Sequence, residues 1–396
     1  MKTRLLIAGL FACLSISAAA QVTGEFYLEK SEFARGEPVF LYFKVSNQGP
    51  GTIQVVAPYL GQPGCSGVLI KVTSSSPPPS SCPDFSLNSC TLNNSMGQAI
   101  PVPPGHSHVD RFLLNFSYEI NSPDEYQVTA SHAGFPLLTS GDAHADLSFR
   151  VDSDASAYPP SKLQLWVDQL KSTDEEKRAE AAMTLASIAP VSLQATLLGF
   201  ARNPEFSRYA PLAFHRLNTP ESLQAMADLV KTNGPGTWEQ MEASRYLAET
   251  GDQKWYPLLL DAAVKNGKIV GFPIYAAELG GPRMLPVLAD LTKNPNTRLP
   301  AIQALGSTDA REAVPILLEF LKSPERDIFY GAEYSLRQLT HHTSGQDPQS
   351  HGTQTEYENW SQWWQLDSAS APIYKDTECE KAIPLPLAPS WTAFNR

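Results

Sequence analysis

The sequence is short of positive charge. Lys and Arg together number 30 against 41 Asp and Glu, which gives a formal net charge of −11 at pH 7. A protein that binds nucleic acid needs a basic surface, so this balance argues against a nucleic-acid partner. The acidic excess is expected instead to keep an ordinary globular chain soluble.

Long apolar runs are also missing. The longest run, at positions 5–16, follows Lys2 and Arg4 and precedes small residues at positions 17–20. A transmembrane helix needs about 20 apolar residues, so we interpret positions 1–20 as a secretory signal peptide cleaved before Gln21. Positions 10–13 loosely resemble a lipobox, which leaves a lipoprotein anchored at Cys13 as the alternative. We therefore predict an exported protein, periplasmic or extracellular, whose mature chain has no membrane span.

Cysteine is scarce, with five residues in the whole chain. Loss of the signal peptide would remove Cys13 and leave Cys65, Cys82, Cys90 and Cys379. An even number in an exported chain suggests two disulfides, and three pairings are open. If all four residues pair, Cys379 must reach back to the N-terminal domain; the alternative is one local bridge and two free thiols. No CxxC spacing accompanies them, so a zinc site is not expected.

Catalytic motifs are not found in the sequence. It has no Gly-x-Ser-x-Gly, no His-Glu-x-x-His, no P-loop and no Gly-x-Gly-x-x-Gly. Scattered residues can still build an active site, so an unrecognised hydrolase stays as a third hypothesis. We predict a non-catalytic protein with no cofactor and no metal.

The N-terminal third carries the pattern of a β domain. Short runs rich in β-branched and aromatic residues alternate with turn signals, and we expect strands at 26–29, 39–47, 52–56, 68–73, 108–116, 125–130 and 145–151. Short strands with no helix between them favour an antiparallel β-sandwich over residues 21–152. The turn phrases at 36–39, 103–106 and 122–128 resemble those of immunoglobulin-like sandwiches in bacterial exported proteins, which implies that fold here.

Three polar residues alternate along one of these predicted strands. His106, His108 and Asp110 would share a face that could bind a metal. A solvated polar face explains the same pattern, and the other histidines do not obviously complete a site.

Beyond a polar, proline-containing linker at 153–161, the hydrophobic period changes from 2 to about 3.6. Six similar segments begin at positions 164, 194, 224, 257, 286 and 315. Each is followed by a second predicted helix, at 178–188, 207–217, 237–249, 269–279, 297–305 and 327–340. A helix pair about every 30 residues indicates an α-solenoid over residues 162–342, because a single pair cannot bury its apolar face alone.

The phrase AIQALGSTDAREAVPIL at 301–317 resembles HEAT repeats of the short, PBS-lyase-like kind. In those repeats an Ala- and Leu-rich second helix ends in Gly, and the next repeat opens a few residues later. The resemblance implies an armadillo-like solenoid of about six HEAT-like pairs. It implies a binding surface rather than an activity, because such solenoids hold many kinds of partner, and no residue here carries the lyase activity over.

Two columns of residues recur in the repeats. The fifth place of most first segments is acidic, which suits either a basic partner or a solvated outer face: Asp168, Asp228, Asp261, Asp290 and Glu319. The second helices of HEAT-like solenoids usually line the concave surface, and Tyr and Arg are common at binding hot spots. We therefore predict these partner-binding residues, with packing between repeats as the alternative for several tyrosines: Tyr209, Arg216, Arg245, Tyr246, Tyr275, Tyr330, Tyr334 and Arg337.

Residues 343–396 are predicted to form a tryptophan-containing helix and an extended tail. Trp360, Trp363 and Trp364 share one helical face, which suits a cap over the last repeat or, alternatively, a platform for stacking sugars. Three further residues, His341, His342 and His351, could bind a metal, although a helix end followed by a loose loop explains them equally.

The function predicted from these patterns is an exported binding scaffold. It would engage a protein partner through the concave helical face, with the sandwich as a second contact or spacer. The alternative is a cell-wall or polysaccharide-binding protein that uses the sandwich and exposed aromatic residues.

Overall fold

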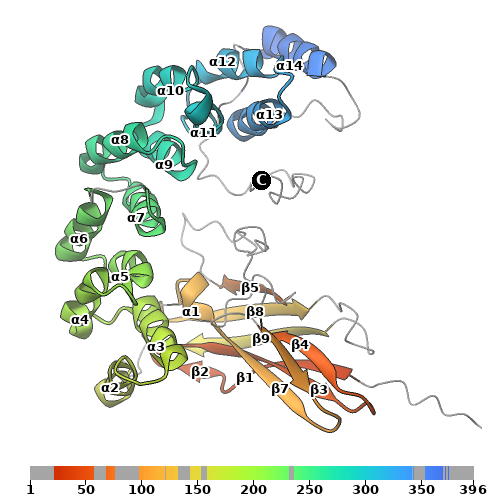
Figure 1. Ribbon diagram of the computed structural model, residues 1–396, viewed down its shortest axis with the longest axis vertical. Coiled ribbons are helices and arrows are strands. Elements are labelled where there is room, and N and C mark those ends of the chain that lie inside the picture. Colours follow the sequence, from red (N-terminus) through yellow and green to blue (C-terminus); the bar gives the residue numbers. More distant parts are fainter. Residues whose placement is uncertain are drawn as a thin grey trace, which may run out of the picture.

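The computed structural model describes residues 22–57, 68–75, 98–120, 122–132, 143–152, 158–231, 236–340, 342, 353–368, 371 and 373. Strands come first along the chain and helices follow, so the predicted order of a β region before a helical region is confirmed (Figure 1). Several predictions lie outside the described residues. They concern the signal peptide with Cys13, the four remaining cysteines, His341 and His351.

The β region contains three sheets. Two of them have the strand orders β1-β3-β7 and β2-β9-β8-β5, and β4 pairs with β6 in a two-stranded ribbon. The strand bounds are β1 (Val22–Leu28), β2 (Glu32–Phe33), β3 (Phe40–Asn47), β4 (Ile53–Ala57), β5 (Val68–Ser74), β6 (Gln98–Val102), β7 (Ser107–Leu113), β8 (Asp124–His132) and β9 (Ala143–Val151).

The two larger sheets share one apolar core. Along β3 every second side chain is buried, starting with Leu41 and Phe43, as the two-residue period of a strand requires. The ring of Phe43 stacks on Phe26 of β1, with centroids 4.4 Å apart, and on His132 of β8, with centroids 5.1 Å apart. Since β8 belongs to the second sheet, the two sheets face each other across this core.

Three details differ from the predicted strands. The pair β2–β9 is parallel, so the region is not wholly antiparallel. Strand β6 was missed because Pro101 makes it resemble a turn, and proline is tolerated where a strand has only one partner. The strand expected at 108–116 ends at Leu113, and the short helix α1 (Leu114–Ser117) follows. There Asn115 turns inward to accept a hydrogen bond from the N–H of Val39 at 2.7 Å.

The helices match the predicted pairs closely. Their bounds are α2 (Pro160–Gln169), α3 (Glu175–Ile188), α4 (Gln194–Leu198), α5 (Ala210–Leu217), α6 (Pro220–Lys231), α7 (Trp238–Glu249), α8 (Tyr256–Lys265), α9 (Gly271–Gly280), α10 (Leu285–Leu291), α11 (Pro295–Leu305), α12 (Ala313–Phe320), α13 (Arg326–Thr340) and α14 (Thr353–Asp367). None of the helices in these described segments has the length and apolar character needed to cross a bilayer.

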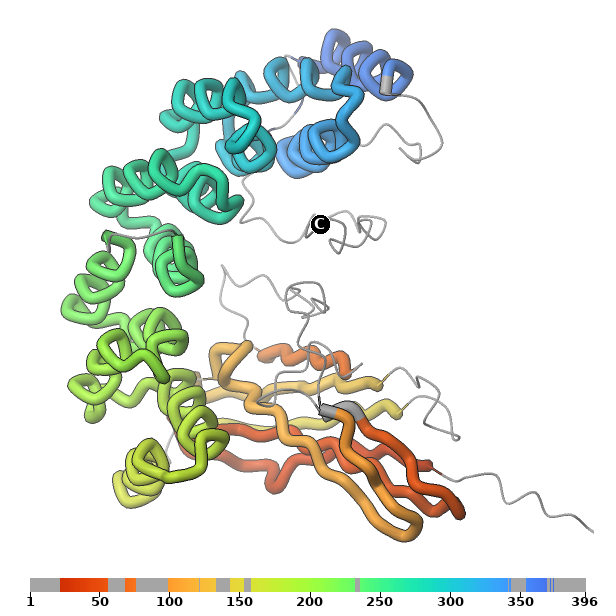
Figure 2. Tube along the Cα trace, viewed as in Figure 1, coloured from red at the N-terminus to blue at the C-terminus, as the bar shows by residue number. Residues whose placement is uncertain are grey.

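The helix pairs follow one another along an arc (Figures 1 and 2). We call α4, α6, α8, α10 and α12 the outer row and α5, α7, α9, α11 and α13 the inner row, after their sides of the arc in Figure 1. Each inner helix packs against the outer helix of its own pair and against the neighbouring inner helices. The inner row is therefore the more enclosed of the two.

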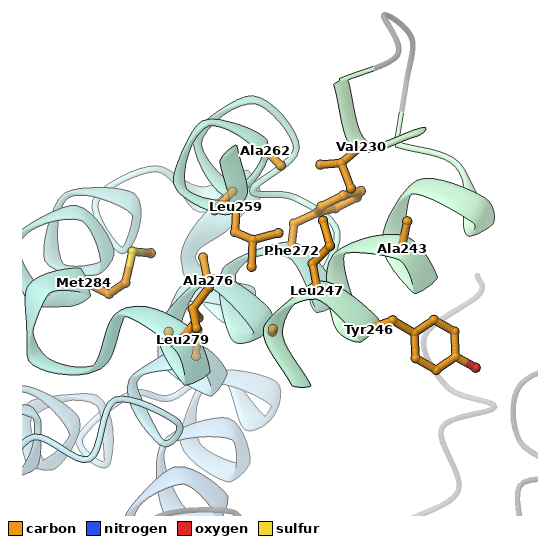
Figure 3. Close-up of a cluster of buried hydrophobic side chains, with 14 of the residues drawn as sticks. Val230, Ala243, Tyr246, Leu247, Leu259, Ala262, Phe272, Ala276, Leu279 and Met284 are labelled. Carbon is orange, nitrogen blue, oxygen red and sulfur yellow. The ribbon is translucent and has the colours of Figure 1, made fainter. Parts of the chain in front are cut away.

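Helix α7 shows how the sequence sets these elements. The side chain of Thr237 accepts a hydrogen bond from the N–H of Gln240, whose own side chain accepts one from the N–H of Thr237, so a capping box starts the helix. Leu247 and Phe272 of α9 then meet in a buried cluster, from which Tyr246 points away (Figure 3). Tyr246 is itself only 9 % exposed, so the same helix is buried on two sides.

Candidate functional site

The inner helices α5, α7 and α9 bring together a group of polar and aromatic side chains. We define the inner strip as His215, Glu242, Arg245, Tyr246, Glu249 and Tyr275. The contacts below link the first five of them, and Tyr275 lies on the adjacent helix α9.

At the centre of the inner strip Arg245 lies over a tyrosine ring. Its guanidinium carbon is 4.0 Å from the centroid of Tyr246, within cation–π range. Its nitrogens pair with the carboxylates of Glu242 at 2.7 Å and Glu249 at 2.5 Å. These spacings of three and four residues place all the partners on one face of α7.

His215 connects this group to the β region. Its ring stacks on Tyr246 with centroids 4.2 Å apart and planes 18° from parallel. Its Nε2 lies 3.5 Å from the carboxylate of Glu119, which follows α1 in the β region. The Tyr246 ring is therefore held by a guanidinium and an imidazole together.

Tyr275 lies on the adjacent helix α9 and is half-buried. Burial is the main cause that raises the pKa of its hydroxyl, and the nearby carboxylates of Glu242, Glu278 and Glu249 raise it further. Tyr246 is 9 % exposed and belongs to the helical core, so it supports its neighbours from below, and burial raises its pKa as well. Both hydroxyls therefore stay protonated at neutral pH and are able to donate hydrogen bonds.

Two of the predicted partner-binding residues are buried and make contacts within the protein. Tyr209 is 4 % exposed and belongs to the helical core. The side chain of Arg216 is 6 % exposed, and its Nη1 pairs with Glu119 at 2.6 Å. Arg216 therefore joins the helical region to the β region, and neither side chain presents a surface to another molecule.

The other three predicted residues form a separate group on α13. Tyr334 is 46 % exposed, and half-buried Tyr330 packs edge-on against Phe329. Arg337 pairs with the buried carboxylate of Glu333. The structure thus places Arg245 over Tyr246 on α7 and Tyr275 on the adjacent helix α9, and leaves the α13 residues apart from them.

The junction between the two regions includes residues that sequence reasoning missed. Glu119 is the clearest case, because the pKa of its carboxyl is lowered to about 2, first by the hydrogen bond with His215 and then by the charge of Arg216. Nothing in the sequence links positions so far apart. Glu242, by contrast, stands three residues before Arg245, a spacing that could have identified the pair.

The acidic column of the first helices faces solvent. Asp261 pairs with Lys265 at 2.7 Å within α8, and each of the other four acidic residues has a polar partner three or four positions away. The partners are Gln164 for Asp168, Lys231 for Asp228, Lys293 for Asp290 and Lys322 for Glu319. Local pairs of this kind neutralise most of the column.

The histidines singled out on β7 do not gather at one point. His108 Nε2 lies 3.0 Å from Asp110, whose pKa is raised by burial. His106 precedes β7, and its Nδ1 lies 2.9 Å from the carbonyl of Pro104. Across the described part of the chain, no three His, Cys, Asp or Glu side chains are placed to hold a metal ion.

The tryptophans of α14 pack against the end of the helical region. Trp360 has no exposed surface and belongs to the helical core. Trp363 and Trp364 are partly buried against the same core, and His342 stacks on Trp363. This arrangement is that of a cap rather than of a row of exposed rings.

No family model and no curated protein matches the chain. Among solved structures, one similar chain is an engineered protein with 19 % sequence identity. The match covers 56 % of this chain and 94 % of that chain, with a TM-score of 0.24. A likeness this slight carries no information on function.

Proposed function

We propose that the protein is a non-catalytic scaffold that binds a protein partner through the inner strip. One observation carries the proposal: Arg245 and half-buried Tyr275 lie on adjacent inner helices, and Arg245 is held over the ring of Tyr246, which is itself 9 % exposed and stacks on His215. Tyrosine and arginine dominate binding hot spots. A side chain held in place before binding loses little conformational entropy when the partner arrives.

The finer fold assignments belong to the same proposal. The stacking of helix pairs, with every inner helix against its neighbours, supports a HEAT-like α-solenoid. The two facing sheets support an immunoglobulin-like sandwich. In this arrangement the sandwich adjoins the first repeats, where Glu119 meets Arg216, and so serves as a second contact or spacer beside the inner strip.

We further propose that the chain is exported, on the strength of the charge and hydrophobicity pattern at positions 1–20. Mass spectrometry of the mature protein from its host is expected to find an N-terminus at Gln21. Non-reduced peptide mapping of the same sample is expected to show Cys65, Cys82, Cys90 and Cys379 in disulfides. An intact Met1 would contradict the export proposal.

The binding proposal is tested on a partner identified by crosslinking in the native host. We expect Tyr275→Ala to weaken its affinity about tenfold or more, as truncation of a hot-spot residue does. The matched control is Tyr334→Ala, an exposed tyrosine on α13, which should change the affinity less than about twofold. Isothermal titration measures both, and equal effects of the two variants would refute the assignment of the inner strip.

A second candidate, polysaccharide binding, is favoured by aromatic rings on the outer face of the β1-β3-β7 sheet. Tyr27 and Tyr42 stack there with centroids 5.1 Å apart, and both are half-buried. If this face binds glycan, Tyr27→Ala should abolish retention of the protein on an insoluble cell-wall polysaccharide. Retention that is unaffected, or absent in the unmutated protein, would dismiss the candidate.

A further inference from the structure

The charges of the inner strip do not balance. The nitrogens of Arg245 lie 2.7 Å from the carboxylate of Glu242 and 2.5 Å from that of Glu249. One positive charge therefore serves two negative charges, and the group keeps a net charge of −1. Glu278 stands three residues after Tyr275 on α9, on the same helical face, and its charge also acts on that tyrosine. This part of the inner row is therefore a negative surface.

Two tyrosine hydroxyls at this surface have no hydrogen-bond partner in the described part of the chain. Tyr246 is 9 % exposed, its hydroxyl points away from the apolar cluster (Figure 3), and the two carboxylates paired on α7 act on it. The ring of Tyr275 covers Gly271, where a Cβ would come within 2.9 Å of that ring and 2.8 Å of Met241 on α7. A buried hydroxyl without a partner is unfavourable, so both tyrosines favour a ligand that forms hydrogen bonds.

A cation is the ligand that fits these groups. Arg245 already has two carboxylate partners and lies 4.0 Å from the centroid of the Tyr246 ring, so it is not available to an anion. Glu249 is 40 % exposed and can accept hydrogen bonds from an incoming ammonium or guanidinium group. The oxygen of a protonated tyrosine also accepts such a bond, and the face of a tyrosine ring attracts a positive charge. A lysine or arginine side chain therefore matches every group in the strip that is open to a ligand.

We propose that the inner strip receives a basic segment of the partner, which places a lysine or arginine side chain beside Glu249 and Tyr275. This inference rests on the proposed function, because it names the chemistry of the partner for the same site. The excess of acidic residues in the whole chain assists such a partner, since opposite charges speed association. An acidic or an apolar segment is the alternative, and the experiments below separate them.

Two labelled peptides, hexalysine and hexaglutamate, test this chemistry on the full-length protein. Fluorescence anisotropy is measured at about 150 mM salt, where charges farther apart than about 8 Å are largely screened. Hexalysine should bind and hexaglutamate should not. Glu249→Gln should weaken the affinity for hexalysine about threefold or more, whereas Glu249→Asp keeps the charge and should change it less than about twofold. Glu278→Gln should weaken it in the same way and serves if Glu249→Gln fails to fold.

The matched control for these variants is Asp261→Asn, which removes an exposed carboxylate of the outer row. It should change the affinity for hexalysine less than about 1.5-fold. The proposal is overturned if Asp261→Asn and Glu249→Gln have equal effects. It is also overturned if hexalysine does not bind or if hexaglutamate binds more tightly.

The partner captured by crosslinking separates this inference from the proposed function. Its affinity should fall in Glu249→Gln and should then depend less steeply on salt. If Tyr275→Ala weakens this partner and Glu249→Gln does not, the inner strip binds a segment of other chemistry and only this inference is overturned. If Tyr275→Ala has no greater effect than Tyr334→Ala, the proposed function fails and this inference fails with it.

Discussion

The outer and inner rows of helices differ in how much of their surface is exposed to solvent. The outer helices present acidic residues and lysines to solvent in pairs such as Asp261–Lys265 and Asp290–Lys293. The inner helices are enclosed by neighbours on several sides, and α11 buries every residue from 300 to 305. Whether a recurring residue is exposed or buried therefore depends on the row of helices that carries it. The type of residue alone does not reveal this.

The comparison also separates two kinds of ion pair. Pairs on the outer row are local and exposed, as the Asp290–Lys293 pair is, and such pairs contribute little to stability. Arg216 is nearly buried and pairs with a residue of another region. Removing Glu119 leaves the buried charge of Arg216 with less compensation, although the exposure of Glu119 itself keeps the effect modest.

The largest expected effect comes from the core between inner helices. Phe272 is 1 % exposed and lies in the cluster of Figure 3, so Phe272→Ala should lower the free energy of unfolding by about 3–5 kcal/mol. Val264, on the outer helix of the same pair, is 56 % exposed. Val264→Ala should change the free energy by less than about 0.5 kcal/mol. Urea unfolding followed by circular dichroism measures both, and similar losses would remove the distinction between the rows.

Glu119 and Glu180, the two carboxylates between the β region and the helical region, should differ in their effect on stability. The pKa of Glu119 is about 2 in the folded protein against an ordinary 4.5, so its contribution is present above pH 4.5 and is lost as the pH falls towards 2. Its side chain is 64 % exposed, and solvent screening limits the loss in Glu119→Gln to about 1 kcal/mol. The unfolding midpoint of this variant at neutral pH should fall, and the difference should vanish in acid.

Glu180 of α3 is the matched control for this carboxylate. It also pairs with an arginine across the junction, Arg111, but burial outweighs that charge and raises its pKa. Its ionised form is therefore disfavoured in the folded state. Glu180→Gln should be neutral or slightly stabilising at neutral pH, and a loss as large as that of Glu119→Gln would contradict this account of the junction.

The smallest effect is expected on the outer row. Asp261→Ala removes an exposed pair of α8 in which both side chains are more than half exposed. The free energy of unfolding should change by no more than about 0.5 kcal/mol. Added salt screens the pair, so the difference between variant and unmutated protein should become too small to measure. A loss above about 1 kcal/mol would show that the acidic column has a structural role after all.

The local pattern of the sequence predicted most of the helical region and less of the site. Hydrophobic period and turn residues located the helices, because a helix is specified by neighbours within a few positions. The same signals misread the strand at 98–102, where Pro101 lies in a two-stranded ribbon. They also missed α1, whose Asn115 is fixed by a bond to distant Val39.

The inner strip was predicted only in part, because its assembly depends on long-range contacts. Tyr246 and Arg245 were expected on one helix, but their contact with His215 and the link to Glu119 follow from the packing of α5 and of the β region. The burial of Tyr209 likewise depends on the helices around it. The sequence identified tyrosines and arginines of the helical region as candidates. Which of these side chains come into contact is decided by the fold.

The central claim, that the inner strip binds a partner, is tested most directly by photo-crosslinking in the native host. A photoreactive amino acid is placed at position 275 on the inner row or at position 264 on the outer row. We predict a discrete adduct with one protein from position 275 and none from position 264. Adducts from position 264 alone, or the same adducts from both positions, would contradict the claim.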